Sequence, residues 1–372
     1  MRAWTRTVGA VTLLGVLSAC SNNSLNEDET TFHLRSLNLV EDSPTLQIDL
    51  DDTTLSSAGY GSATGFSAGH PGEHTLSFSA LLPGDLDDDD DDDETEMPVS
   101  GASAYTFLAG TEYTVVAYGR MDDIQTYMIE GLDQREDVDD DKLVLQFTHA
   151  SPETPTVDVY VTAAKAGLAS RYYVDTLSIT ETTMPFELSL VRDDDDLDED
   201  STLSADVVVE LMAAGTSDVL YRSKSMTFAE QNRIMMAIVD SNGPMSMATK
   251  LLIVGTGEAR DSRDGAALKF VHISHDTPAL DVTVGSGLAD PLAENIGFRQ
   301  STDYAPIKAG ENGMIAVPAG AGHPYIFFEE FDAAVGGYYT AYAMGPASVV
   351  DAVVLAASAR SVPTQAIFRF LH

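Results

Sequence analysis

The sequence predicts an all-β protein built from tandem, immunoglobulin-like antiparallel β-sandwiches. Many short segments alternate apolar with polar residues and are separated by glycine and proline, which is typical of strands joined by turns. One strand–turn–strand pattern also occurs three times along the 372-residue chain. Hydrophobic residues make up 44% of the chain, which is enough to fill a core in each repeat. We therefore expect three sandwich domains, over residues 31–135, 142–258 and 266–372.

The first residues carry the features of an export signal. Arg2 and Arg6 precede the apolar run Val8–Leu17, and small residues then lead to Cys20. A basic start, a short apolar segment and small residues at a cleavage point predict a signal peptide over residues 1–19. The apolar run is about half the roughly 20 residues that a membrane-spanning helix needs, so it favours cleavage over a membrane span.

Cys20 is the single cysteine of the chain, which excludes a disulfide framework and a cysteine-based zinc cluster. The segment Leu17–Cys20 resembles the lipobox of bacterial lipoproteins. The resemblance implies that Cys20 becomes the lipidated first residue of the mature chain, with residues 20–30 as a polar tether. Ser21, rather than aspartate, follows the cysteine, and this implies an outer-membrane lipoprotein that faces the periplasm or the surface.

Each repeat opens with two strands joined by a proline-containing turn. In the second repeat Leu145, Phe147 and His149 alternate with polar residues, and Val157–Val161 follows on the far side of the turn. The repeats lie about 110 to 120 residues apart, which is the size of one small domain. The three opening segments are Leu34–Leu50, Leu145–Val161 and Leu268–Val284.

The opening segment of the second repeat resembles the family called domain of unknown function 4397, whose members are β-sandwich modules of bacterial surface proteins and lipoproteins. The string F-x-H-A-S-P-x-x-P-x-V-D-V-Y-V carries this resemblance at Phe147–Val161, and Phe270–Val284 repeats most of it. The first repeat departs from the string, because Asn38 replaces the histidine and Gln47 replaces the aspartate. The resemblance implies an exported module with no established activity.

Further runs have the alternation or the continuous apolar character of strands, whereas amphipathic helices are few. Ala163–Ser170 and Leu288–Asn295 each allow one short helical turn. The later predicted strands are Leu76–Phe78, Tyr113–Tyr118, Phe186–Leu188, Val207–Leu211, Ile234–Val239, Leu251–Val254, Met314–Val317, Tyr338–Ala343 and Val349–Leu355.

The last residues, 366–372, repeat the start of the opening pattern. An isolated strand cannot bury its apolar face. We therefore expect this segment to pair with a sheet of the third domain, with Phe368 and Phe370 buried.

The chain is strongly acidic, with 59 acidic and 20 basic side chains and a formal net charge of −39. This charge argues against binding to nucleic acid, which carries the same sign. The expected partners are the membrane, through the lipid on Cys20, and other envelope proteins or surface glycans.

Three runs concentrate the acidic residues: Asp85–Glu96, Asp133–Asp141 and Asp193–Asp200. Carboxylates are ligands that calcium prefers, but the first run does not fit an EF-hand loop because Glu94 stands where glycine is needed. Continuous aspartate is also typical of a hydrated, self-repelling loop, which is the interpretation we favour, and adaptation to salty surroundings also explains such acidity. The candidate calcium ligands are Asp89, Asp91, Asp93, Asp194, Asp196 and Asp198.

One serine lies in a motif that is also found in hydrolases. Gly65–Gly69 has the form G-x-S-x-G around Ser67, with His70 and His74 nearby. A nucleophile elbow needs a strand before the serine and a helix after it. The His-Pro-Gly sequence that follows disfavours a helix, so we expect no catalytic serine here.

The form H-x-S-x-x-x-P-x-x-D occurs twice. A catalytic or metal-binding interpretation pairs the histidine with the aspartate. A structural interpretation has the histidine and serine satisfying backbone groups at a strand end and turn, and recurrence at the opening of two domains favours it. The residues are His149, Ser151, Pro155 and Asp158, and then His272, Ser274, Pro278 and Asp281.

Together these patterns predict a non-catalytic, lipid-anchored protein of the cell envelope. We expect it to serve as a scaffold, spacer or adhesion module through its sandwich domains. The alternative is a calcium- or glycan-binding surface lipoprotein that uses the acidic loops. No catalytic residue and no cofactor other than calcium is expected.

Overall fold

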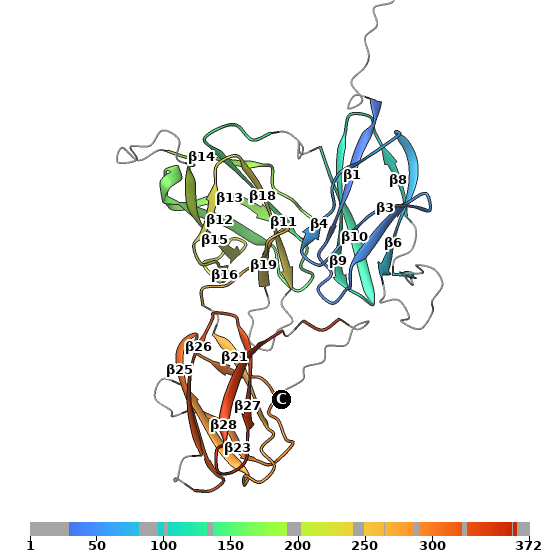
Figure 1. Ribbon diagram of the computed structural model, residues 1–372. Helices are drawn as coiled ribbons and strands as arrows, with labels where there is room; N and C mark the ends of the chain where they lie inside the picture. The colour runs from blue at the N-terminus through green and yellow to red at the C-terminus, as the bar shows by residue number, and fades with distance from the viewer. Residues whose placement is uncertain are drawn as a thin grey trace, which may run out of the picture.

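The computed structural model describes residues 30–81, 96–99, 103–131, 137–191, 202–240, 249–263, 265–285, 290–321, 326–358 and 360–362. Nearly all elements in this part of the chain are β-strands, and they form three sandwiches of two sheets each, which confirms the all-β tandem fold (Figure 1). The predicted signal peptide and C-terminal strand lie outside the described residues.

The first domain contains two five-stranded sheets. We call the sheet that holds the first strand of a domain its opening sheet, and the other its second sheet. The opening sheet has the order β10-β9-β1-β4, with β5 also on β1, and the second sheet has the order β3-β2-β6-β7, with β8 also on β6. The strands are β1 (Phe32–Asn38), β2 (Leu46–Leu50), β3 (Thr53–Ala58), β4 (Ser62–Ala63), β5 (Ser67–Gly69), β6 (Gly72–Leu81), β7 (Glu96–Pro98), β8 (Ser103–Phe107), β9 (Glu112–Arg120) and β10 (Asp123–Glu130).

The second domain repeats this plan with two five-stranded sheets. Its opening sheet has the order β14-β11-β18-β19-β20, and its second sheet has the order β13-β12-β15-β16, with β17 also on β15. The elements are β11 (Lys142–His149), β12 (Val157–Ala163), η1 (Ala164–Ala166), β13 (Leu168–Leu177), β14 (Phe186–Ser189), β15 (Ser204–Ala213), β16 (Val219–Arg222), β17 (Met226–Ala229), β18 (Asn232–Asp240), β19 (Thr249–Ile253) and β20 (Gly257–Ala259).

The third domain has two four-stranded sheets, with the orders β24-β21-β27-β28 and β23-β22-β25-β26. The expected helical turn near residue 290 is wrong, because β23 pairs with β22 and buries Ala293 in the core. The strands are β21 (Ala266–His272), β22 (Leu280–Gly285), β23 (Asp290–Ile296), β24 (Ala305–Ile307), β25 (Gly310–Pro318), β26 (Phe327–Ala333), β27 (Tyr338–Met344) and β28 (Asp351–Ala357).

The sheets are antiparallel apart from one pair in each domain. The opening strand runs parallel to a neighbouring strand from the later part of its domain, as β1 with β9, β11 with β18, and β21 with β27. The same exception at the same place in all three domains shows that they are copies of one module, including the first, whose sequence departs most from the shared string.

The cores follow the predicted alternation. Phe147 on β11 and Val159 on β12 are fully buried between the two sheets of the second domain. Phe270 and Val282 occupy the same places in the third domain. Each domain therefore folds around its own apolar core, as the opening segments predict.

Candidate functional site

The sites predicted in the N-terminal and acidic segments lie outside the described residues. This holds for the lipidation site Cys20 and for the six candidate calcium ligands, Asp89, Asp91, Asp93, Asp194, Asp196 and Asp198. Within the described part of the chain, no group of three or more His, Cys, Asp or Glu side chains is placed to hold a metal ion. The helices of that same part include none with the length and apolar character of a membrane span.

His149 is a structural residue at the end of β11. Its Nε2–H donates to the carbonyl of Pro155 across 3.2 Å, and its Nδ1 accepts the backbone N–H of Ser151 at 3.3 Å. The Nδ1 atom can accept a hydrogen bond only when the ring is neutral, and burial lowers the pKa of His149. The neutral ring therefore joins the strand end to the turn through these two hydrogen bonds.

Asp158 takes no part in these hydrogen bonds of His149 and has its own backbone partner. Its carboxylate accepts the backbone N–H of Gly215 at 2.9 Å and the hydroxyl of Thr176. In the third domain the equivalent Asp281 accepts the N–H groups of Asn295 and Gly320, which lowers its pKa. The aspartate therefore fastens loops of the second sheet and is not a catalytic partner of the histidine.

The three repeats make the same contact with different side chains. His272 donates from Nε2 to the Pro278 carbonyl at 3.1 Å, as His149 does in its own domain. In the first domain Asn38 donates from Nδ2 to the Pro44 carbonyl at 3.4 Å and accepts the backbone N–H of Val40 at 3.0 Å. An amide thus replaces the imidazole with the bonding pattern of His149, which agrees with the structural interpretation of the motif.

The G-x-S-x-G segment does not form a nucleophile elbow. Ser67 opens β5, a short strand paired with β1, and a turn and strand β6 follow it where a helix is required. Gly69 is needed for packing, because a Cβ there would lie 2.3 Å from the ring of Phe32. His74 is held by the Asp51 carboxylate at 2.6 Å and by the His70 carbonyl at 2.7 Å. Its bond to Asp51 raises the pKa of His74.

The first two domains share an apolar interface. The outer face of the first opening sheet packs against the outer face of the second, and Leu37 and Val116 on one side and Ala237 on the other are fully buried. Figure 1 shows the two sandwiches side by side. The buried residues of this first interface are Leu37, Leu39, Val116, Tyr118, Ile129, Ala150, Met235, Ala237, Val239 and Leu252.

Polar contacts surround this first interface. The hydroxyls of Tyr127 and Thr148 meet at 2.5 Å, and burial raises the pKa of Tyr127. The Lys250 ammonium pairs with the Glu41 carboxylate at 2.6 Å, with both side chains largely buried. A backbone hydrogen bond also joins Gly255 N–H to the Gly61 carbonyl at 2.8 Å. Both the apolar and the polar contacts therefore fix one relative position of the two domains.

The third domain reaches the first through the segment after β28. Arg360 donates from Nε to the Glu41 carbonyl at 2.6 Å and from Nη2 to the Ser43 carbonyl. Its guanidinium also lies 5.0 Å from the ring centroid of Tyr60. The chain thus returns from the third domain to the edge of the first interface, beside the Lys250–Glu41 pair (Figure 1).

The linker between the second and third domains makes a second polar contact. Arg260 donates from Nη1 to the carbonyl of Gly336, which lies in the turn before β27. Gly336 has a φ of +63°, and a Cβ there would lie 2.6 Å from Nη1 of Arg260. Glycine is therefore required at this position by both the backbone conformation and the close approach.

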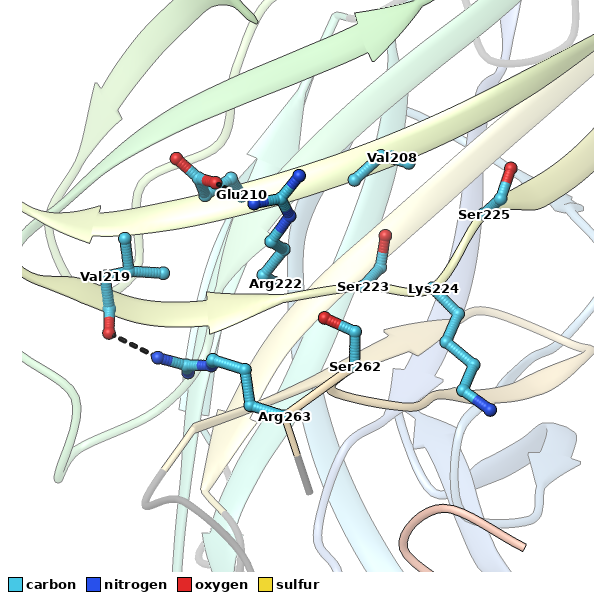
Figure 2. Close-up of a pocket in the computed structure, with 9 residues that line it drawn as sticks. All are labelled: Val208, Glu210, Val219, Arg222, Ser223, Lys224, Ser225, Ser262 and Arg263. Carbon is cyan, nitrogen blue, oxygen red and sulfur yellow. Dashed lines mark hydrogen bonds and ion pairs between the residues drawn. The ribbon is translucent and has the colours of Figure 1, made fainter. Parts of the chain in front are cut away.

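An open pocket of about 490 Å³, with polar side chains around a largely apolar surface, lies on the second domain where this linker passes β16 (Figure 2). Arg222 points toward Glu210 and approaches it at 3.7 Å, while Arg263 is turned to the Val219 carbonyl at 2.8 Å. The pocket is lined by Val208, Glu210, Val219, Arg222, Ser223, Lys224, Ser225, Ser262 and Arg263.

Neither the first interface nor the pocket was predicted from the sequence. A usable signal for the interface was present, since Ile234–Val239 and Val115–Tyr118 are continuous apolar runs, and such runs are typical of strands buried on both faces. The pocket had no local signal. It joins a strand of the second domain with linker residues that follow about 40 positions later, so only the fold brings them together.

The family comparison agrees with the repeats. A family model described as Domain of unknown function (DUF4397) matches residues 32–160 and 266–372, which is more than half of the chain. The first match covers the first domain and continues into β11 and β12, and the second begins with β21. A search among curated proteins finds no match to this chain.

Proposed function

The chain belongs to the family described as Domain of unknown function (DUF4397), and from its architecture we propose that it is a non-catalytic, lipid-anchored scaffold of the cell envelope. In this role the β-sandwiches act as a spacer of fixed geometry that presents loops to other envelope proteins. The observation that carries the proposal is the apolar first interface, together with Arg360 returning from the third domain to its edge.

The interface supports a scaffold because a spacer must keep its domains in one arrangement. Interfaces between domains of one chain are commonly small and polar, and relative motion is then expected. Here ten side chains form one buried apolar cluster across the first two domains. Separating the domains would expose this surface to water, at about 25 cal/mol for each Å² of apolar area.

The lipid anchor rests on the sequence around Cys20. Membrane fractionation of cells that produce the Cys20→Ala variant tests it. We expect this variant to leave the membrane fraction or to remain unprocessed. Normal membrane retention would overturn the lipoprotein assignment.

Small-angle X-ray scattering of the full chain carrying Cys20→Ala, which is free of lipid, tests the scaffold. We expect a profile that one fixed arrangement of the three domains reproduces. A profile that requires an ensemble of independently moving domains would overturn the scaffold proposal and leave the fold untouched.

Calcium binding by the acidic loops is the alternative function. Thermal unfolding with and without calcium, before and after deletion of Asp87–Asp93, tests it. We expect the same melting temperature in all four measurements, because hydrated loops add no stability through the ion. A calcium-dependent rise that is lost on deletion would favour the alternative.

A further inference from the structure

The second sheet of the second domain carries a row of aromatic and charged side chains on its outer face. Register pairs Tyr173 with Tyr160, Tyr160 with Glu210, and Glu210 with Arg222. Their neighbours Val159, Val161, Val209, Leu211 and Tyr221 are buried in the core, so the row faces outward. The first interface uses the opening sheet, which leaves this face uncovered by the first domain (Figure 1).

Charged groups in the row are already arranged around the aromatic rings. The Arg171 guanidinium lies 4.8 Å from the ring centroid of Tyr160 and pairs with the Glu210 carboxylate. Tyr173 is 47% exposed, and its ring contacts Tyr160 edge to face with centroids 5.6 Å apart. Tyr173 therefore presents an open aromatic surface at one end of the row.

The pocket at the other end is lined by more basic than acidic side chains among the described residues. The Arg222 side chain is 58% exposed, and its one ion-pair contact within the described residues is the 3.7 Å approach to Glu210. Ser225, Ser262 and Lys224 add a hydroxyl or ammonium donor each at the lining. Among the described residues of the lining, Glu210 is the only carboxylate, and it is shared between Arg171 and Arg222.

Hydrogen bonds fix the position of the pocket walls. Arg263 donates to both oxygens of Asp261 and to the carbonyls of Val219 and Leu220. The backbone of Ser262 also donates to the Arg222 carbonyl at 2.7 Å. A pre-organised wall lowers the entropy cost of binding a ligand.

The charge around the pocket differs in sign from that of the whole chain. The chain has a net charge of −39, whereas the described residues at and beside the pocket include four basic side chains, Arg171, Arg222, Lys224 and Arg263, and two acidic ones, Glu210 and Asp261. At physiological salt a charge acts over about 8 Å, so the pocket presents its own sign to a ligand that has reached it. The complementary ligand is rich in acceptors and negatively charged.

From these observations we propose that this face of the second domain binds an acidic oligosaccharide. A carboxylate or sulfate group lies in the pocket against Arg222, and sugar rings extend across the strands to stack on Tyr173. Three strand spacings separate these two residues, or about 14 Å, so the ligand is an extended oligosaccharide and not a single sugar. Aromatic rings suit the apolar faces of sugar rings because both surfaces lose water on contact. The inference does not depend on the scaffold proposal.

Isothermal titration calorimetry of the full chain carrying Cys20→Ala tests the proposal. The probes are an oligogalacturonate, a sulfated heparin-type oligosaccharide, a neutral gluco-oligosaccharide and sodium sulfate. We expect at least one acidic oligosaccharide to bind and the neutral one not to. Arg222→Gln should weaken that binding about tenfold, as expected for a lost charge-assisted bond, and Tyr173→Ala should weaken it about fivefold. Lys308→Gln, which removes an exposed charge on the third domain, should leave it unchanged.

Each other result overturns the proposal. Equal binding of the neutral oligosaccharide, with no effect of Arg222→Gln, would remove the role of the pocket. Equal binding of sodium sulfate, with no effect of Tyr173→Ala, would reduce the site to an ion site. No binding of either acidic oligosaccharide to a chain with the melting temperature of the folded protein would remove the site altogether.

Discussion

The two junctions between domains are built from different physical forces. The first domain meets the second through an apolar cluster that includes the fully buried Leu37, Val116 and Ala237. The third domain is held by arginines, since Arg260 and Arg360 donate to backbone carbonyls. No apolar cluster of the described residues contains side chains of both the second and the third domain.

This difference suggests how one repeated module gives two kinds of connection. The cores of the domains are alike. The difference between the modules lies in the side chains on the outer face of the opening sheet. In the first two domains that face is apolar at the contact, and the two faces cover each other. Apolar contact is insensitive to salt and pH, whereas a few hydrogen bonds are individually weak and depend on geometry. The following predictions test this contrast, from the largest expected effect to the smallest.

Placing a charge in the first interface should have the largest effect. In Val116→Asp a carboxylate replaces a fully buried side chain and faces apolar neighbours. We expect a loss of roughly 3 kcal/mol or more of unfolding free energy in chemical denaturation, because an unpaired buried charge is costly. Small-angle scattering should also show the first two domains separating.

Val349→Asp is the matched control, because Val349 is 71% exposed on the third domain. The same substitution there should change stability by about 0.5 kcal/mol or less. Equal effects of the two substitutions would show that the first interface does not hold the domains together.

Breaking the Lys250–Glu41 pair should have an intermediate effect. Both side chains are at most 15% exposed, so Lys250→Met removes a positive charge from beside a nearly buried carboxylate. We expect a loss of about 2 kcal/mol in chemical denaturation, less than the cost known for fully buried pairs. The double variant with Glu41→Gln should recover part of this loss. Strict additivity of the two single changes would contradict a direct interaction.

The sequence predicted the fold well because its signals are local. Alternation along Leu145, Phe147 and His149 identifies the residues that face the core, and all three are buried. It also predicts that Gln146 and Thr148 face water, yet both are buried as well. Thr148 bonds Tyr127 of the first domain. A polar residue in an alternating strand gives no indication that another domain covers its face.

The candidate sites also show that local sequence patterns do not reveal contacts between distant segments. The hydrogen bonds of the histidine motif could be expected from the sequence, because strand, turn and bonding partners lie within ten residues of one another. The pocket requires Arg222 from a strand edge and Arg263 from a linker, and the row adds Tyr173 from three strands further along the sheet. Such sites depend on strand order, which the pattern of single segments does not specify.

Removing Arg360 should affect the second junction alone. Arg360→Ala deletes hydrogen bonds to two carbonyls and the contact with Tyr60. We expect a loss of about 1 kcal/mol, because a hydrogen bond contributes about this much net to stability. Hydrogen exchange should speed up at Ser358 and at position 360, with no change at Val116. Lys308→Ala on the third domain is the control. An equal rise in exchange at Ser358 and at position 360 in this control variant would contradict the specific role of Arg360.

The smallest effect should come from pH, and it should act on the first junction only. His149 lies between Thr148 and Ala150, which both contact the first domain. Burial lowers the pKa of His149, although Asp240 and Glu181 nearby oppose the shift. As pH falls below about 6.5, His149 binds a proton in the unfolded chain but stays neutral in the folded chain. The free energy of unfolding therefore decreases as pH drops from about 6.5 toward the pKa of His149 in the folded chain.

His74 has a raised pKa, so its contribution to stability is present at low pH and is lost as pH rises through that pKa. Chemical denaturation from pH 7.5 to 5.5 separates the contribution of His149 from that of His74 when the parent chain is compared with His149→Asn. This variant carries the residue that the first domain has at the equivalent position, Asn38. The difference between them should shrink on acidification, and a constant difference would show that His149 is not a buried neutral ring.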